Sequence, residues 1–167
     1  MEIVKAPAVE TRPEIPYVGI RAVTPFRGML GVRDALLEEI IAWADGSALA
    51  VVGYGFLRLH VIDMKGDMDI EVGLATRERS DVIGRVSSGV LPAGRYATLT
   101  YQGAGTGANR ALLEWVRAEG LPLDRCDVPE GDLFACRYEA YLTDPRVEPR
   151  KKRWDIELAF RLRSHAS

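Results

Sequence analysis

Three glutamates stand in segments whose alternation is typical of β-strands. They are Glu71, Glu139 and Glu157, and Tyr141 follows the second of them at the spacing that shares one face of a strand. Aromatic rings give contact area and attract cations, and a carboxylate gives a counter-charge that strengthens where water is excluded. A partly desolvated carboxylate also has a raised pKa, which suits it to general acid or base catalysis. The combination favours a site for a planar or cationic organic molecule.

Alternation assigns each of these residues to one face of its strand. In the last strand, the large apolar residues at positions 154, 156, 158, 160 and 162 share a face that we expect to pack on helices, so Glu157 faces away. In the preceding strand, Cys136 and Tyr138 are expected in the core, which turns Glu139 and Tyr141 away from the helices. The apolar residues at 68, 70, 72 and 74 likewise face a helix and leave Glu71 on the other side.

We therefore expect a groove on the sheet face opposite the helices. Its expected lining is Tyr54, Phe56, Glu71, Glu139, Tyr141 and Glu157, with Tyr101 closing one end and Trp154 as a further wall despite its place on the core face. Glu139 and Glu157 are the expected polar anchors, and they are the catalytic candidates if the protein is an enzyme. The alternative is an ordinary half-polar sheet face whose charges, such as Arg137 and a neighbouring acid, pair across strands.

The elements that must position these residues occur twice in the same order. Each set contains a strand, a helix and two strands: 17–24, 30–46, 50–62 and 68–76 in the first, and 94–102, 109–119, 133–142 and 154–163 in the second. The pattern predicts an α+β fold of two βαββ modules related by a pseudo-twofold axis, with antiparallel sheets, helices on one side and the groove on the other. The expected modules span residues 14–76 and 94–163, with a connector at 77–93 and an extended lead-in before residue 14.

Several other sequence motifs could suggest a functional site, but each is explained more simply by an ordinary loop or core residue. Residues 103–108, GAGTGA, fit a dinucleotide-binding pattern, but no apolar parallel strand follows the next helix, so we expect a mobile loop at a pocket rim. The basic run at 149–153 is expected to be a solvated loop. His60 and His165 have no partner at a metal-ligand spacing, and Cys136 is expected in the core.

Length and composition narrow the class of protein. The chain has 167 residues, near the size of one domain, and its formal charge of −2 gives no electrostatic basis for tight nucleic-acid binding. It begins without the apolar region of a secretory signal, and no apolar stretch is long enough to span a membrane. The two cysteines are separated by nine residues, which is not the spacing of a zinc motif. These observations predict a cytoplasmic domain with no metal, no cofactor and no direct contact with nucleic acid or membrane.

The ordered segments resemble the GyrI-like small-molecule-binding domain, also known as the bacterial effector-binding domain. The resemblance is carried mainly by four segments of the second half, residues 91–97, 113–115, 138–145 and 154–158, and more loosely by residues 16–21 and 70–73. It covers about residues 14–163. It implies two βαββ modules around a groove that binds hydrophobic, often aromatic or cationic, compounds, with acidic residues matching Glu139 and Glu157 as anchors.

The resemblance leaves three functions open. The first is the sensing or sequestration of a drug-like compound. The second is hydrolysis of strained, cyclopropane-bearing alkylating compounds, as in similar stand-alone members, with a glutamate assisting the attack of water. The third is a protein-interaction module, such as a modulator of DNA gyrase. The chain shows no helix-turn-helix segment, so it resembles the stand-alone members, and the loop after Tyr101 reads Gly-Ala-Gly where the family usually has Gly-Pro-Tyr.

Overall fold

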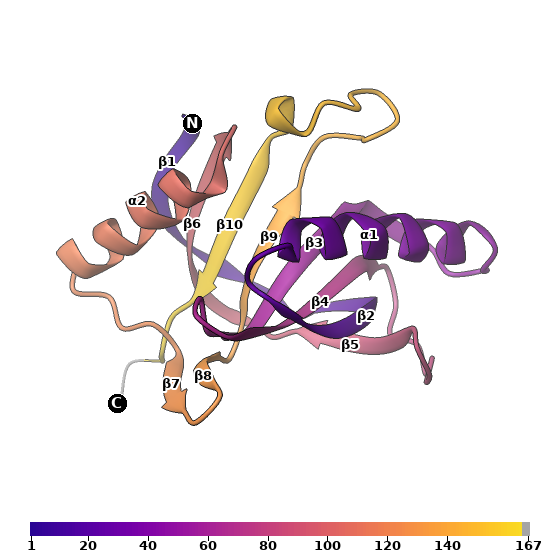
Figure 1. The fold of residues 1–167 in the computed structure, drawn as a ribbon, viewed down its shortest axis with the longest axis horizontal. Helices are drawn as coiled ribbons and strands as arrows, with labels where there is room; N and C mark the ends of the chain where they lie inside the picture. Colours follow the sequence, from indigo (N-terminus) through magenta and orange to yellow (C-terminus); the bar gives the residue numbers. More distant parts are fainter. Residues whose placement is uncertain (165–167) are drawn as a thin grey trace.

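The computed structural model describes residues 1–164 and shows two α-helices lying over one large antiparallel sheet (Figure 1). The α+β fold predicted from the sequence is therefore confirmed. Within the described chain the helices are α1 (Met29–Asp45) and α2 (Gly105–Ala118), and a short 3-10 turn spans Lys151–Arg153. The strands are β1 (Glu2–Arg12), β2 (Ile15–Pro25), β3 (Val51–Ile62), β4 (Asp67–Thr76), β5 (Ser87–Leu91), β6 (Gly94–Gln102), β7 (Arg125–Val128), β8 (Gly131–Phe134), β9 (Arg137–Tyr141) and β10 (Ile156–Arg161).

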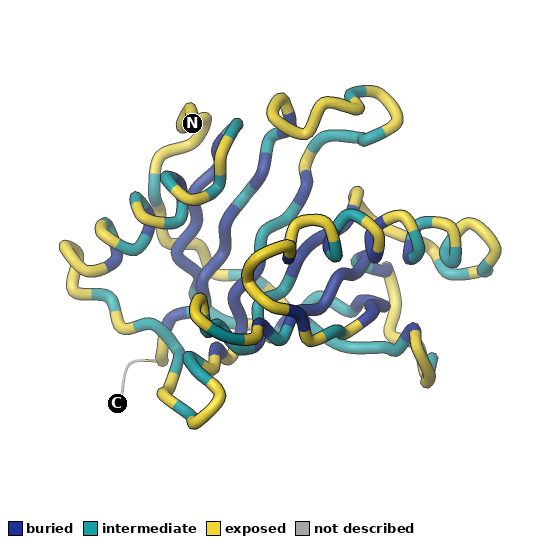
Figure 2. The backbone as a smooth tube through the Cα atoms, in the orientation of Figure 1, coloured by how far each residue is buried: buried dark blue, intermediate teal, exposed yellow. Residues whose placement is uncertain are grey.

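The sheet has the order β1-β6-β10-β9-β3-β4-β2-β5, and the β7–β8 hairpin joins it through β3. The two halves of the chain meet where β9 pairs with β3. Helix α1 packs on β2, β3 and β4, whereas α2 packs on β6 and β1. The central strands are the most buried part of the molecule, and exposed backbone is concentrated in the loops, the helix surfaces and the sheet edges (Figure 2). Neither described helix is long and apolar enough to cross a membrane.

Strand register identifies which side chains share the face under the helices. One row across the sheet runs through paired positions and contains, in order, Leu99, Leu158, Glu139, Leu57, Val72 and Ile20. Its aliphatic members all belong to the main hydrophobic core together with residues of both helices. Because paired positions lie on the same face of a sheet, this row places the Glu139 carboxylate among aliphatic side chains on the helix face.

The predicted orientation of residues 133–142 is therefore wrong. Glu139 and Tyr141 face the helices, while Cys136 and Tyr138 lie on the opposite face in a second, smaller apolar cluster. Both faces of β9 are covered by other parts of the molecule. Its alternating side chains therefore enter two different shielded clusters, and neither face of the strand is open to solvent. In the neighbouring strands the predicted sides are correct, because Ile70 and Ile156 are buried on the helix face.

The remaining differences lie at the edges and in connections. The lead-in forms β1, an edge strand paired with β6, and the connector contains β5, which pairs with β2. The strand expected at 133–142 is divided between β8 and β9. Helix α2 begins at Gly105, so part of the glycine-rich segment forms its first turn, and Asn109, where the predicted helix starts, lies inside the helix. The basic run at 149–153 is exposed, as expected.

Candidate functional site

Five residues form a cluster on the helix face, which we call the helix-face cluster: Arg33, Tyr101, Glu139, Tyr141 and Trp154. The Arg33 guanidinium lies over the Tyr141 ring at 5.6 Å from its centroid. One of its terminal nitrogens, Nη1, is 3.8 Å from Oε2 of Glu139. The Trp154 and Tyr141 rings meet edge to face at a centroid distance of 5.5 Å. Tyr101 completes the group, since both Tyr101 and Tyr141 pair in register with Ile156.

Helix α1 brings Arg33 into this cluster. The buried residues of α1 are Met29, Arg33, Leu36, Leu37 and Ile40. Spacings of three and four residues place them on one side of the helix, so Arg33 occupies a position in the apolar stripe that faces the sheet. Its residue exposure is only 9%. The side chain therefore reaches β9 from within the core-facing surface of α1.

The charges of the helix-face cluster are only partly compensated. Burial raises the pKa of Glu139 despite the opposing attraction of Arg33. Burial also disfavours the charged form of Arg33, but Tyr141, Glu139 and Asp34 together raise its pKa. Arg33 donates from Nε and Nη2 to Oδ1 of Asp34 at 3.1 and 2.9 Å. Its remaining nitrogen, Nη1, is left facing Glu139 beyond hydrogen-bond distance.

The Tyr141 hydroxyl is a second incompletely used group. Tyr141 is 2% exposed, and within the described chain its hydroxyl oxygen has no hydrogen bond of ordinary geometry. Burial is the main reason that its pKa is well above the ordinary value, and the nearby Glu139 carboxylate adds to the effect. Buried polar groups in folded proteins are normally hydrogen-bonded, and the polar groups that act on this hydroxyl are those of Glu139 and Arg33.

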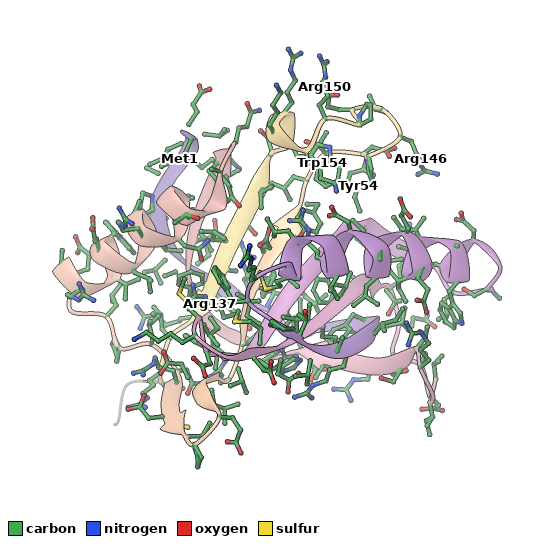
Figure 3. The ribbon with its side chains drawn as sticks, viewed as in Figure 1. Met1, Tyr54, Arg137, Arg146, Arg150 and Trp154 are labelled. Atoms are coloured by element: carbon green, nitrogen blue, oxygen red, sulfur yellow. The ribbon has the colours of Figure 1, made fainter. Side chains whose placement is uncertain are left out.

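A cavity of about 200 Å³ adjoins the cluster between α1 and the loop that connects β9 to β10. Trp154 lines it together with Asp34, Leu37, Ile41, Pro149 and Lys151. Figure 3 shows Trp154 at the end of the sheet beside this loop. An ion pair between Lys151 and Asp34 ties the loop to α1. The cavity thus leads from the surface to Trp154, and its wall includes the carboxylate that holds Arg33.

The opposite face of the sheet contains carboxylates with partners at hydrogen-bond distance. Glu71 Oε1 accepts a hydrogen bond from the Tyr17 hydroxyl at 2.7 Å and lies 2.8 Å from Nε2 of His60. Arg58 donates to the Tyr17 hydroxyl at 3.1 Å. Burial opposes ionisation of Glu71, but its contacts with His60, Tyr17 and Arg58 outweigh burial and lower its pKa. These groups neutralise one another inside the fold.

Glu157 lies on the same opposite face and is held by β1. Arg12 Nη1 is 2.8 Å from Oε1 of Glu157 and donates to the Tyr138 hydroxyl at 2.9 Å. A chain of edge-to-face ring contacts links Tyr17, Phe56, Tyr138 and Tyr96, with centroid distances of 4.9, 6.1 and 6.0 Å. We call these groups, with Arg12, Arg58, His60, Glu71 and Glu157, the opposite-face cluster.

The structure therefore divides the expected groove between two faces. Four of the predicted residues meet in the helix-face cluster, namely Tyr101, Glu139, Tyr141 and Trp154. Phe56, Glu71 and Glu157 lie in the opposite-face cluster, on the side where the groove was expected. Tyr54 belongs to neither, because it is 37% exposed near the start of β3. The expectation of a single groove opposite the helices is wrong, because the covered face of β9 was taken for the open one.

Arg33 was missed, although the sequence contains a signal for it. A charged residue four positions after Met29 and four before Leu37 falls in the apolar stripe of α1. Arg12 and Tyr17 were also missed as partners of Glu157 and Glu71, and the sequence contains no local signal for pairs this far apart. Arg137 is likewise buried, stacks on the Phe134 and Phe160 rings and donates to Asn109 Oδ1 at 2.9 Å, instead of pairing with an acid. Figure 3 shows it nearer the middle of the sheet.

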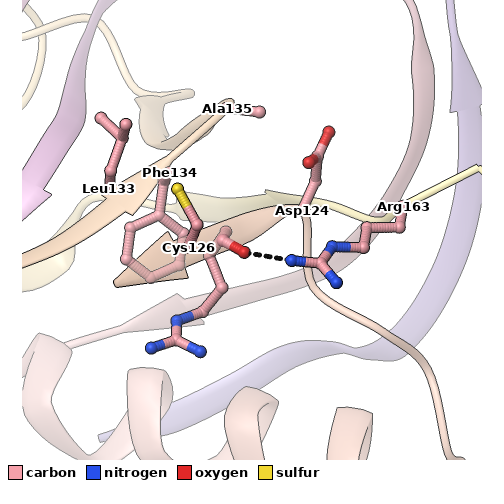
Figure 4. A pocket seen from close by; sticks show the side chains of 7 residues that line it. Asp124, Cys126, Leu133, Phe134, Ala135 and Arg163 are labelled. Atoms are coloured by element: carbon pink, nitrogen blue, oxygen red, sulfur yellow. Dashed lines mark hydrogen bonds between the residues drawn. The ribbon is translucent and has the colours of Figure 1, made fainter. Parts of the chain in front are cut away.

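A second cavity, of about 330 Å³, lies beside the β7–β8 hairpin and contains no predicted site residue (Figure 4). Exposed Cys126 lines it, whereas Cys136 is buried as expected.

Among residues 1–164 no three His, Cys, Asp or Glu side chains form a group that could hold a metal ion. His60 contacts Glu71, and His165 lies outside the described residues.

Several solved structures share this arrangement. The C-terminal domain of EcmrR matches with a TM-score of 0.71 and 18% identity over 97% of this chain and 99% of its own. EcmrR in a DNA complex matches with a TM-score of 0.72 and 18% identity, and 96% of this chain spans only 58% of that chain. SAV2435 bound to tetraphenylphosphonium matches with a TM-score of 0.62 and 14% identity over 95% of this chain and 94% of its own.

No curated protein matches the chain. The model of the GyrI-like small-molecule-binding domain, in contrast, matches residues 5–163, nearly all of the fold described above. The chain belongs to the GyrI-like small-molecule-binding domain family.

Proposed function

We propose that this domain binds an aromatic small molecule at the helix-face cluster, with Glu139 as its polar anchor and Tyr101, Tyr141 and Trp154 as its walls. Family membership supports small-molecule binding in general. The observation that carries the choice of site is the incomplete pairing of Glu139, which lies 3.8 Å from its nearest cation in an otherwise apolar row. A largely buried carboxylate whose ion pair is this long is costly to the fold, which favours a role in binding.

The cavity between α1 and the β9–β10 loop supplies the proposed entrance. Trp154 lines the cavity and its ring contacts Tyr141. A ligand that enters there would therefore contact the two aromatic rings before it reaches the Glu139 carboxylate. The Lys151–Asp34 ion pair joins two partly exposed side chains, and such pairs contribute little stability, so the loop is able to move without a large penalty. A ligand larger than the present cavity would require that movement.

Titration of planar aromatic compounds into the full chain, followed by tryptophan fluorescence and calorimetry, tests this function. Glu139→Gln and Tyr141→Phe are expected to raise the dissociation constant by about 10-fold or more, which corresponds to a loss of about 1.4 kcal/mol of binding free energy. Glu157→Gln is the matched control, because Glu157 is a strand glutamate committed to Arg12 on the other face. Equal effects of the Glu139 and Glu157 variants on affinity would contradict the proposed site.

A hydrolase using the same carboxylate is the second candidate. Its support is the raised pKa of Glu139, since a raised pKa makes a carboxylate a stronger base for accepting a proton from water. Glu157 is the weaker of the two predicted catalytic residues, because an ion pair with Arg12 occupies it. Turnover of a strained electrophile that is lost in Glu139→Gln and retained in Glu157→Gln would favour this candidate, and binding without turnover would favour the first.

We also propose that the fold consists of two βαββ modules, residues 14–76 and 94–163, with residues 77–93 between them. The order β6-β10-β9 on one side of the centre repeats as β2-β4-β3 on the other, which supports a pseudo-twofold relation. The modules share the β3–β9 pairing. Fragments 1–76 and 77–167, expressed separately and mixed, should associate into a folded complex. Independent folding of each fragment without association would contradict a shared core.

A further inference from the structure

Two carboxylates compete for the guanidinium of Arg33. Asp34, the next residue of α1, accepts hydrogen bonds from Arg33 Nε at 3.1 Å and from Arg33 Nη2 at 2.9 Å. Glu139 on β9 faces the remaining terminal nitrogen, Nη1, at 3.8 Å. Hydrogen bonds between a guanidinium and a carboxylate are usually about 2.7–2.9 Å long. Arg33 is therefore bonded through two nitrogens to Asp34 and only loosely paired with Glu139.

The carboxylate that holds Arg33 is the more exposed of the two. The Asp34 side chain is 36% exposed at the wall of the cavity between α1 and the β9–β10 loop, whereas the Glu139 side chain is 14% exposed. Burial opposes ionisation of Asp34, but hydrogen bonds from Lys151 and Arg33 outweigh it and lower its pKa. An ion pair is stronger where water is excluded, so Glu139 would gain more from the guanidinium than Asp34 does. The arrangement leaves the more buried carboxylate with the weaker pairing.

Arg33 has only a short distance to move in order to change partner. Its Nη1 would have to approach Oε2 of Glu139 by about 1 Å to reach the length of a charge-assisted hydrogen bond. The guanidinium donors form a rigid planar fork, so the two bonds to Asp34 fix the direction in which Nη1 points. Loss of the Asp34 carboxylate would free this fork to turn toward Glu139.

The other polar groups around Glu139 do not depend on α1. Tyr141 and Arg137 act on its carboxylate from the same strand, β9, and Tyr101 interacts with it from β6. Arg33 is the group of α1 that acts on it. The position of the Arg33 guanidinium is therefore the part of the Glu139 environment that a substitution on α1 can change, and the titration of Glu139 reports that position.

We propose that Asp34 is a positioning residue of the site, which holds the Arg33 guanidinium away from Glu139 and so keeps the Glu139 carboxylate available to a ligand. This role rests on the proposed function of the helix-face cluster and deepens it by naming the group that keeps the anchor free. Asp34 acts on the anchor through Arg33. Without Asp34, Arg33 would close its ion pair with Glu139, and a ligand would have to break a largely buried ion pair before it could bind.

Carboxyl-carbon NMR of the full chain without ligand, with labelled glutamates, tests this role. Asp34→Ala should lower the pKa of Glu139, because Arg33 becomes its close partner. Removal of the Asp34 charge also acts on Glu139 directly, so the same substitution is made in Arg33→Met, where it should leave the pKa of Glu139 nearly unchanged. Lys151→Met removes the other partner of Asp34, and Glu38→Ala removes another carboxylate that lines the cavity. Neither of these control variants should lower the pKa of Glu139.

Calorimetry with 2-naphthol gives a second readout. This neutral planar compound has a hydroxyl group that can donate to a carboxylate. Asp34→Ala should raise its dissociation constant about 10-fold, because the ion pair between Arg33 and Glu139 must be broken first. Lys151→Met should change the dissociation constant less than about 2-fold, since it removes a partly exposed ion pair and leaves Arg33 bonded to Asp34.

An unchanged or raised pKa of Glu139 in Asp34→Ala would overturn the inference, because Arg33 would not have moved to Glu139. Equal lowering in the wild-type and Arg33→Met backgrounds would also overturn it, since the effect would then come from the Asp34 charge alone. If Arg33→Met did not fold, Glu38→Ala would serve the same purpose, because a general loss of negative charge at the cavity would lower the pKa there too. If 2-naphthol and other aromatic compounds bound to no variant, the proposed function would fail, while the titration of Glu139 would still support or overturn the role of Asp34.

Discussion

Glu71, which is buried, and Glu139, whose side chain is 14% exposed, are two strand glutamates with opposite surroundings. Glu71 lies on the opposite face within hydrogen-bond distance of Tyr17 and His60, at 2.7 and 2.8 Å. Glu139 lies on the helix face and has Arg33 at 3.8 Å as its nearest cation. The surroundings lower the pKa of Glu71 and raise that of Glu139. Both residues are glutamates inside strands of the same sheet, so the difference between their pKa values comes from the partners that other elements supply.

This comparison separates a structural carboxylate from a candidate binding carboxylate. A fully paired buried charge resists removal, because each partner is left without its counter-charge. A poorly paired one has little to lose and can exchange its weak partner for a ligand. Glu157 resembles Glu71 in this respect, since Arg12 holds it at 2.8 Å and also donates to Tyr138. Among these three glutamates, Glu139 has the longest ion pair, at 3.8 Å, and it belongs to the cluster that contains the cavity-lining Trp154.

The largest expected effect is the loss of stability in Glu71→Ala. The substitution removes the acceptor of the buried Tyr17 hydroxyl and the partner of His60, so the free energy of unfolding should fall by about 3 kcal/mol. Urea denaturation followed by circular dichroism measures it. A loss below about 1 kcal/mol, the size typical of an exposed ion pair, would remove the contrast with Glu139.

A smaller loss is expected for Arg12→Met. The methionine keeps the apolar part of the arginine side chain but leaves Glu157 and the Tyr138 hydroxyl without their β1 partner, which should cost about 1–2 kcal/mol. Both side chains of the ion pair retain some exposure, at 16% and 18%, so water can replace part of the interaction. Combining Arg12→Met with Glu157→Gln in a double-mutant cycle isolates the pair. Additive effects would show that Arg12 and Glu157 do not interact.

Glu139→Gln should change the unfolding free energy by less than about 1 kcal/mol, in either direction. Its ionised form has a weak partner and an unfavourable apolar environment, so the neutral amide is tolerated in its place. The same urea experiment measures this variant beside Glu71→Ala. A loss as large as that of the Glu71 variant would mean that both glutamates are structural.

The pH dependence of stability should distinguish the two glutamates in sign. The pKa of Glu71 is lowered in the folded state, so its contribution is present above the ordinary value of 4.5 and is lost as pH falls through the lowered value. The pKa of Glu139 is raised, so its protonated form stabilises the fold below about 4.5, and this contribution is lost as pH rises through the raised value. Urea midpoints of Glu71→Gln and Glu139→Gln against the wild type, measured across this range, should therefore change in opposite directions. A common direction would contradict the assigned environments.

The sequence predicted the helices and most central strands because their apolar periodicity reflects one continuous core. It did not predict the face of β9, since Glu139 and Tyr138 are both covered and alternation distinguishes faces only where one of them is open. It did not predict β1 either, because that edge strand is largely exposed on both sides and lacks a two-residue period. The contacts that define each site join residues such as Arg33 and Glu139, far apart in the chain, and no local pattern specifies them.

Carboxyl-carbon NMR of selectively labelled glutamates tests the central claim most directly. The spectra of Glu71, Glu139 and Glu157 would be recorded without ligand and with a saturating planar aromatic compound that binds in the calorimetric titration. The account predicts that the Glu139 resonance moves on binding and titrates at higher pH than Glu71, while Glu71 and Glu157 stay in place. Movement of Glu71 or Glu157 with an unchanged Glu139 resonance would place the ligand on the opposite face and contradict the account.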